Sequence, residues 1–257
     1  MTPMADCCSN GSCRGHIPVE EIIRDCDRLF NEENTAGLGE HLRFWRRKAL
    51  ELGDKKGELS MLNELVGHYR MNRDEVRGRA AVEEALALIA ALDIAQTLSA
   101  GTIFLNCATA LQSFGSCQQA AALYQQAEAC YQAHLAAEDE RFAGLYNNMA
   151  SVYVDTGAYD SAERCYGRAL DILKKSGNQM DLAVTYINLA QLYDALDPEN
   201  ARIETLLDQA AACFDNAEIN GYYAHTCRKC ASALGYFGRF ADEADLNQKA
   251  DAFYGRK

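Results

Sequence analysis

Apolar residues recur at helical spacing on both sides of the short segment Asp155-Thr156-Gly157. In the two flanking stretches they return at steps of three and four residues, which places them on one face of an amphipathic helix. The positions that form these two faces are Tyr146, Met149, Ala150, Tyr153, Ala162, Tyr166, Ala169 and Leu173. Gly157 can adopt the positive φ that ends a helix, and so short a link favours two antiparallel neighbours. The segment therefore predicts a helix pair with two apolar faces that it cannot bury alone.

The same pattern returns along the chain at a nearly constant interval. Ala85, Ala127 and Ala169 follow one another at steps of 42 residues in the second helix of successive pairs. Three further sets keep steps of 40 to 42 residues in the first helices or at their ends: Val66, Ala108, Ala150 and Ala190; Tyr69, Leu111, Tyr153 and Tyr193; and Gly115 with Gly157. An interval of this length is typical of stacked repeats, in which each helix pair covers the apolar faces of its neighbours.

Together these positions resemble the tetratricopeptide repeat. Small residues at Ala150, Ala162 and Ala169 stand where the family has close helix crossings, and Tyr159 stands at one of its large positions. The matching repeats begin near Ile23, Leu59, Gly101, Ala143, Ala183 and Ala224. The resemblance implies an all-α fold over residues 18–257, a right-handed superhelix or α-solenoid of about six helix-turn-helix pairs without a sheet. The family's usual repeat is about 34 residues long, so the longer interval predicts longer second helices.

The sequence departs from the family pattern at the ends of two first helices. Arg73 and Asp197 replace glycine there. Pro198 follows directly and lies between the apolar residues Leu196 and Leu206. Because proline cannot continue a helix, we expect an irregular turn in the fifth repeat.

Residues 1–17 differ from the remainder of the chain. They are small and polar, contain Gly and Ser, and show no apolar periodicity, which predicts a flexible, Cys-rich leader before a helix that starts at Pro18. The leader contains Cys7, Cys8, Cys13 and His16, four soft metal ligands whose spacing matches no known zinc pattern. A metal- or redox-responsive protein that uses these cysteines is therefore an alternative function.

The cysteines outside the leader are predicted to be free, buried thiols. The chain holds eleven, an odd number, and neither a signal peptide nor an apolar run of membrane length is present. Free thiols in a reducing cytoplasm fit this pattern. Cys227 and Cys230 form a C-x-x-C motif, but they occupy core positions of the last repeat, matched by Tyr146 and Met149. We therefore expect them to pack as small apolar residues.

Charge narrows the range of partners. The net charge is −12; residues 1–82 carry 13 basic and 14 acidic side chains, whereas residues 83–257 carry 12 and 23. An acidic chain disfavours nucleic acids and anionic membranes, because phosphate binding draws on clustered Lys and Arg. The excess of acidic residues fits either a solvated acidic surface or a site that selects a basic ligand. The basic cluster at residues 43–48 is expected to pair with Glu40, Glu51 and Asp54.

No catalytic motif is present in the sequence. It contains no G-x-S-x-G elbow, P-loop, dinucleotide-binding glycine pattern or H-E-x-x-H. The five histidines form no nucleophile or metal set. We therefore expect a non-enzymatic protein without a cofactor or a metal site in the repeats.

A row of asparagines is the candidate binding feature. Asn106, Asn148 and Asn188 lie 42 and 40 residues apart on the predicted first helices, which line the concave wall of such superhelices. An amide offers a donor and an acceptor, so the row can hold the backbone of an extended peptide. In related long-repeat scaffolds such rows serve this purpose, although asparagine is also common at this position. The same groove would be lined by Asn63, Asn147, Thr109, Ser151, Gln191, Asp155 and Asp194.

These patterns predict a cytoplasmic scaffold that binds a peptide or partner protein in an acidic, amide-lined groove. A second alternative is a sensory module of the same fold for a signalling peptide. The last predicted helix carries the apolar stripe Leu246, Ala250 and Phe253 with no helix after it. This stripe predicts that the C-terminal end binds either a second copy of the chain, which would form a homo-oligomer, or a partner.

Overall fold

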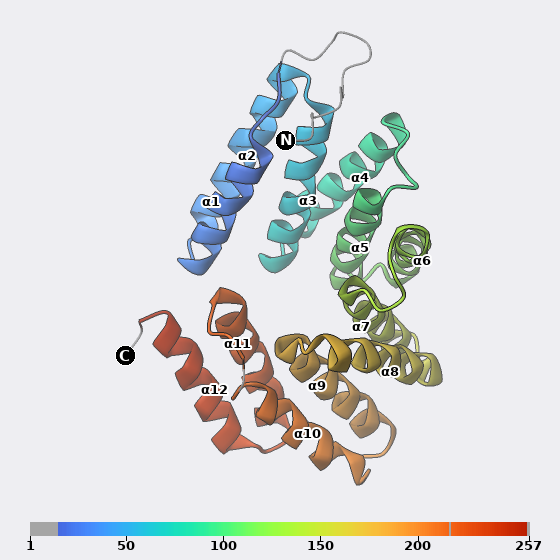
Figure 1. Ribbon diagram of the computed structural model, residues 1–257, viewed down its shortest axis with the longest axis vertical. Helices are drawn as coiled ribbons and strands as arrows, with labels where there is room; N and C mark the ends of the chain where they lie inside the picture. The colour runs from blue at the N-terminus through green and yellow to red at the C-terminus, as the bar shows by residue number, and fades with distance from the viewer. Residues whose placement is uncertain (1–14, 216, 256–257) are drawn as a thin grey trace. The chain divides into compact units, whose positions relative to one another are not determined.

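The computed structural model describes residues 15–215 and 217–255, and in this part of the chain the secondary structure consists of twelve α-helices without a strand (Figure 1). The helices are α1 (Val19–Asn31), α2 (Thr35–Leu52), α3 (Lys55–Met71), α4 (Glu75–Ala91), α5 (Leu98–Ser113), α6 (Cys117–His134), α7 (Glu140–Asp155), α8 (Tyr159–Ser176), α9 (Gln179–Leu196), α10 (Arg202–Cys213), α11 (Gly221–Tyr236) and α12 (Phe240–Phe253). The predicted all-α class is confirmed.

The chain forms two compact units, which are described separately. Unit 1 comprises residues 1–130 and holds α1 to α5 with most of α6; unit 2 comprises residues 131–257 and holds α7 to α12. Within unit 2, successive helices pack as the pairs α7/α8, α9/α10 and α11/α12. The pairs α1/α2 and α3/α4 pack in the same way in unit 1.

Local sequence signals fix where the helices begin and end. At many N-termini a side-chain oxygen accepts a hydrogen bond from a backbone N–H in the first turn, as Asp54 does from Gly57 at 3.0 Å. The residues that cap helices in this way are Asn34, Asp54, Asp74, Thr97, Asp139, Asn178 and Asn220. Gly157 and Gly177 have φ of +75° and +77°, as expected of glycines that end helices.

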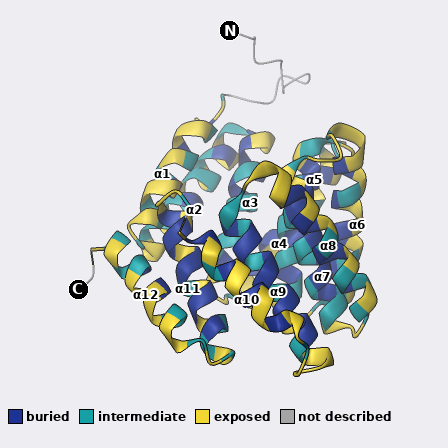
Figure 2. Ribbon diagram, turned by 60° about the horizontal axis from the view of Figure 1, so that its bottom comes forward, coloured by how far each residue is buried: buried dark blue, intermediate teal, exposed yellow. Residues whose placement is uncertain are grey.

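The predicted repeat register is confirmed by burial. Ala85, Ala127 and Ala169 are fully buried, and so are the matched first-helix residues Val66, Ala108, Ala150 and Ala190. Figure 2 shows buried positions along one side of most helices and exposed positions along the other. The helices therefore bury the faces that the periodicity predicts.

Gly78 stands where the fourth repeat has Ala162, and the structure shows why. A Cβ atom at Gly78 would lie 2.5 Å from Cζ of Phe114. Even the smallest side chain would therefore force the Phe114 ring to move.

The two departures from the family pattern have different outcomes. Arg73 takes over the glycine conformation, with a φ of +55°. Asp197 instead is extended, with φ −158° and ψ +99°, because the ring of Pro198 disfavours a helical residue before it. The irregular turn predicted for the fifth repeat is thus present before α10.

Two expectations from the sequence need correction in detail. Ile17, assigned to the leader, is buried, and its N–H donates to Asp54 Oδ2 at 3.0 Å. Leu246 and Ala250 are already buried in unit 2, where α12 packs on α11, so they form no uncovered stripe. Phe253 is half-buried, and oligomerisation through this end stays a prediction.

The basic cluster on α2 forms only some of the ion pairs that the sequence predicts. Lys48 pairs with Glu51 at 2.7 Å, as predicted. Arg46 instead contacts Glu58 on α3 and Glu84 on α4. The long side chain of Arg46 thus links α2 to α3 and α4 in unit 1.

None of the helices in the described residues is long and apolar enough to cross a membrane.

Candidate functional site

In unit 2, the first helices of three successive pairs present one continuous set of accessible residues. Helix α9 packs against both α7 and α11. The accessible residues recur at three- and four-residue steps, so each helix contributes a single stripe. The stripes consist of Gly144, Asn148, Ser151 and Asp155 on α7; Asp181, Val184, Asn188, Gln191 and Asp194 on α9; and Tyr222, His225, Lys229, Ser232 and Tyr236 on α11. We call this surface the α7/α9/α11 face.

Two tyrosine–aspartate hydrogen bonds join α11 to α9 on this face. The Tyr222 hydroxyl donates to Asp181, and the Tyr236 hydroxyl donates to Asp194 Oδ2 at 2.8 Å. Burial and the neighbouring Asp181 raise the pKa of Tyr222 above its usual value, so its hydroxyl stays a proton donor. Tyr222 and Tyr236 are nevertheless 49% and 70% exposed. Their rings therefore add accessible aromatic surface to the face.

Asn147, a predicted groove residue, lies between helices. Its Nδ2 donates to Thr185 Oγ1 at 2.8 Å, and Thr185 in turn donates to the backbone oxygen of Asp181 at 2.6 Å. Asn147 Oδ1 is buried and has no hydrogen-bond partner among the described residues. Thr185 is itself buried. Asn147 thus connects α7 to α9 through a buried hydroxyl.

Two predicted amides on α9 are accessible and unused. Asn188 is half-buried and Gln191 is exposed, and neither side chain makes a hydrogen bond with any residue that the structure describes. Asn148 and Ser151 are half-buried on α7, and Asp155 is exposed at its end. The side-chain amides of Asn188 and Gln191 therefore keep both N–H donors and their oxygen acceptor for a ligand.

In unit 1 the corresponding polar groups bond to one another. Asn106 on α5 donates from Nδ2 to Asn63 Oδ1 on α3 at 2.8 Å, and Asn63 donates to Glu64 Oε1 at 3.1 Å. Burial raises the pKa of Glu64. The Tyr124 hydroxyl lies 3.1 Å from Thr109 Oγ1. The predicted site residues of unit 1 are therefore engaged in contacts within the fold.

The repeat cysteines are buried, as predicted, except for the half-buried Cys117. Burial raises the pKa of Cys227 to about 11 and that of Cys230 to about 12, and Cys107 in unit 1 has a pKa of about 12 for the same reason. Such thiols stay protonated at neutral pH and are poor nucleophiles and metal ligands.

Of the four leader residues predicted as possible metal ligands, the structure describes only His16. Cys7, Cys8 and Cys13 lie outside the described residues. His16 lies next to Asp54, with 3.3 Å between Nδ1 and Oδ1. Within residues 15–215 and 217–255, no group of three or more His, Cys, Asp or Glu side chains is arranged to hold a metal ion.

Comparison with known proteins agrees with the helical-repeat fold. A family model described as tetratricopeptide repeat matches residues 141–203, which cover α7, α8 and α9. Residues 141–203 therefore carry the tetratricopeptide repeat. No curated protein matches the sequence. The tetratricopeptide fold is shared with solved structures, although their sequence identities are low.

Three of these structures illustrate the similarity. A Rap protein complexed with competence and sporulation factor is 13% identical, with 93% of this chain and 65% of that chain covered and a TM-score of 0.66. The apo form of RapI is 10% identical, with 91% and 82% covered and a TM-score of 0.64. BtubC (BKLC) from P. vanneervenii is 17% identical, with 93% and 92% covered and a TM-score of 0.55. Identities this low establish the shared fold alone.

The tyrosines of the α7/α9/α11 face were not predicted from the sequence. Their signal was the repeat interval itself, because Tyr222 lies 41 residues after Asp181 and Tyr236 lies 42 residues after Asp194. A hydroxyl one repeat from a carboxylate can reach it across neighbouring first helices. Thr185 gave no such signal because its contact with Asn147 depends on how closely α7 and α9 approach.

Proposed function

We propose that this protein is a non-enzymatic scaffold that binds an extended peptide, or an extended segment of a partner protein, on the α7/α9/α11 face of unit 2. The observation that carries the proposal is the pair of accessible amides, Asn188 and Gln191, on one stripe of α9. Side chains without a structural partner are available to a ligand, and each amide can pair with a backbone N–H and C=O at once.

Charge on the same face favours a basic segment. Asp155 is exposed, and Asp194 accepts a hydrogen bond from Tyr236. Asp181 accepts one from Tyr222 and one from Asn178 Nδ2. A carboxylate has about four lone-pair sites, so both Asp181 and Asp194 can accept from a further donor. Lys229 is the basic residue among the stripes and lies exposed on α11. Lys and Arg side chains of a partner would contact these carboxylates and stack on the exposed faces of Tyr222 and Tyr236.

The comparison with Rap supports a sensory variant of this proposal. A protein with a similar fold has been solved in complex with competence and sporulation factor. A related use here would be recognition of a signalling peptide.

The proposal is tested with peptides selected from a displayed random library on the intact chain. Titration calorimetry of a selected peptide should show that Asn188→Ala and Gln191→Ala each weaken binding by about 1–2 kcal/mol, through lost hydrogen bonds to the peptide backbone. Methylation of single backbone nitrogens of the peptide should weaken binding by a similar amount. Added salt should weaken it further if the peptide is basic.

Gln209→Ala is the matched control. Gln209 is an exposed amide of the same unit, but it lies on α10, a second helix. This variant should bind the peptide as the unmodified protein does. Unchanged affinity in the Asn188→Ala/Gln191→Ala double variant would overturn the proposal.

A further inference from the structure

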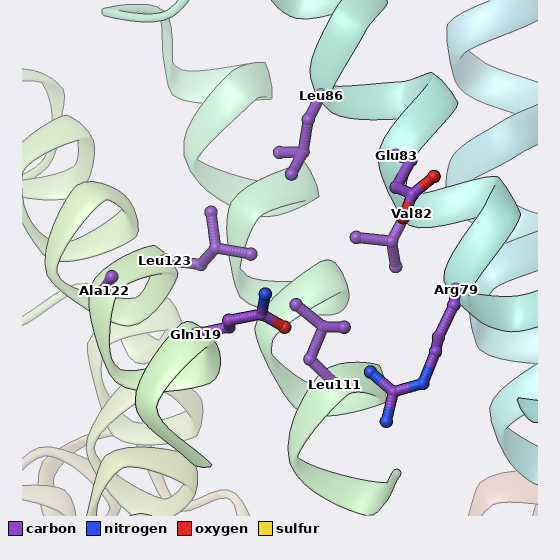
Figure 3. Close-up of a pocket in the computed structure, with 8 residues that line it drawn as sticks. All are labelled: Arg79, Val82, Glu83, Leu86, Leu111, Gln119, Ala122 and Leu123. Carbon is purple, nitrogen blue, oxygen red and sulfur yellow. The ribbon is translucent and has the colours of Figure 1, made fainter. Parts of the chain in front are cut away.

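A pocket of about 350 Å³ lies in unit 1, on residues that play no part in the proposed peptide binding. Figure 3 shows its lining side chains arranged around one space, from α4, α5 and α6. They are Arg79, Val82, Glu83, Leu86, Leu111, Gln119, Ala122 and Leu123. This volume is near the lower end of the range for small-molecule sites in proteins, roughly 300–1,000 Å³.

The floor of the pocket is apolar. Val82, Leu111 and Leu123 are buried, and Leu86 is half-buried beside them. Branched aliphatic side chains of this kind form a surface suited to a ligand's own aliphatic group, because contact removes apolar area of both from water. The floor therefore fits a side chain such as that of leucine or isoleucine.

Arg79 contributes a positive charge that is fixed in place. Its Nε donates to Glu75 at 2.8 Å, Nη1 to Ser116 Oγ at 2.8 Å and Nη2 to the backbone oxygen of Phe114 at 2.6 Å. A guanidinium has five N–H donors, so two have no partner among the described residues. Because three bonds hold the group, a carboxylate can use the remaining two without the entropy cost of ordering it.

Glu83 contributes an unpaired negative charge one helical turn further along α4. It lies four residues after Arg79, where the two would ordinarily pair with each other. Arg79 instead pairs with Glu75, and Glu83 makes no ion pair with any described residue. Gln119, across the pocket on α6, likewise has no hydrogen-bond partner in the described part of the chain.

We propose that this pocket binds a free amino acid with an aliphatic side chain. The ligand's carboxylate would accept hydrogen bonds from the two unused N–H groups of Arg79. Its ammonium would pair with Glu83, and its side chain would rest on Val82, Leu111 and Leu123. The two opposite charges at one helical turn's spacing distinguish a free amino acid from a residue inside a peptide, which has neither terminal charge.

The ligand side of the proposal is tested by NMR titration of the isotope-labelled intact chain with leucine. We expect saturable shifts of backbone amides in α4, α5 and α6. N-acetylleucine lacks the ammonium, leucinamide lacks the carboxylate and alanine lacks the aliphatic group, and each should bind at least about tenfold more weakly, about 1.4 kcal/mol. Absence of saturable binding by leucine at millimolar concentration, or equal binding of leucinamide or N-acetylleucine, would overturn the proposal.

Two substitutions with matched controls test the protein side. Ala122→Phe fills the mouth of the pocket and should abolish leucine binding, whereas Ala87→Phe adds the same ring to an exposed position of α4 that does not line the pocket. Glu83→Gln should remove the preference for leucine over N-acetylleucine. Asp93→Asn removes one charge of the same unit outside the pocket and should preserve that preference.

Folding is not at risk in these variants, because all four positions are exposed. Thermal melts should therefore coincide with that of the unmodified chain. Leucine binding that survives Ala122→Phe, or a preference that survives Glu83→Gln, would place the ligand elsewhere and overturn the proposal.

Discussion

The first helices of the two units carry the same kind of polar residue but use it differently. In unit 1 the amide of Asn106 is bonded to Asn63 on the neighbouring first helix, 2.8 Å away. In unit 2 the amide of Asn188, one member of the same repeat-spaced row, has no partner among the described residues. Repeat spacing therefore predicts which helix carries an amide, but not whether the fold has already used it.

The four predictions that follow test this comparison between the units. The two that concern buried thiols and close helix crossings should have similar effects on stability in both units. The two that concern polar contacts should separate contacts made inside the fold from groups left for a ligand.

Alkaline pH should destabilise both units through their buried thiols. Cys107 in unit 1 and Cys230 in unit 2 have pKa values of about 12, whereas the unfolded thiols ionise near 9. The folded state thus holds these protons more tightly, and stability that is complete below pH 9 is lost as pH rises toward 12. Each thiol should lower the free energy of unfolding by up to about 1.4 kcal/mol per pH unit in that range. Denaturant melts at a series of pH values give the free energy of unfolding as a function of pH. Between pH 9 and 12 this free energy should fall less steeply with pH in Cys107→Ala and Cys230→Ala than in the parent chain. An equal pH dependence would contradict the burial of these thiols.

Overpacking the close helix crossings should also act alike in the two units. Ala108 on α5 and Ala150 on α7 are fully buried and 42 residues apart. Ala108→Leu and Ala150→Leu should each reduce the free energy of unfolding by about 1–3 kcal/mol, because a larger side chain forces the helices apart. Chemical denaturation measures the loss. An unchanged midpoint for either variant would mean that the repeat register is wrong in that unit.

The buried bridge between α7 and α9 should cost more to break than an exposed contact. Thr185→Val keeps the shape of the side chain but leaves Asn147 Nδ2 without an acceptor. Because Asn147 Oδ1 already lacks a partner among the described residues, the loss should be about 1–2 kcal/mol. Equilibrium unfolding of Thr185→Val beside Thr185→Ser, which keeps the hydroxyl, isolates the hydrogen bond. Equal stability of the two variants would show that the hydrogen bond between Asn147 and Thr185 does not stabilise the fold.

The smallest effects bear most directly on the comparison between the units. Asn106→Ala should lower stability by about 0.5–1.5 kcal/mol, because it removes a hydrogen bond between α5 and α3. Asn188→Ala should change stability by about 0.5 kcal/mol or less, because no bond to the described residues is lost. Paired denaturant melts give the difference. If Asn188→Ala proved the more costly, Asn188 would belong to the fold rather than to a binding face.

Much of the candidate face could be placed from the sequence, but its chemistry could not. The repeat interval placed Asn148, Asn188 and Gln191 on first helices, and the structure has them there. The interval could not show that Asn147 turns toward Thr185 while Gln191 turns outward, since both lie on the same helices as the row. A rotation of about 100° per residue separates a bridging amide from an accessible one, and helix packing sets which of them meets a neighbour.

The helices, their order and their buried faces could all be predicted from the sequence. Those features follow from local signals and short periods: capping residues such as Asp54, glycines such as Gly157, and small residues at 42-residue steps. Which polar groups are left unused depends instead on how the helices pack. Arg79 is fixed by residues 35 and 37 positions away, and Asn106 by one 43 positions away. Such contacts depend on how closely two helices approach and how far a side chain reaches, and no periodic pattern encodes those distances.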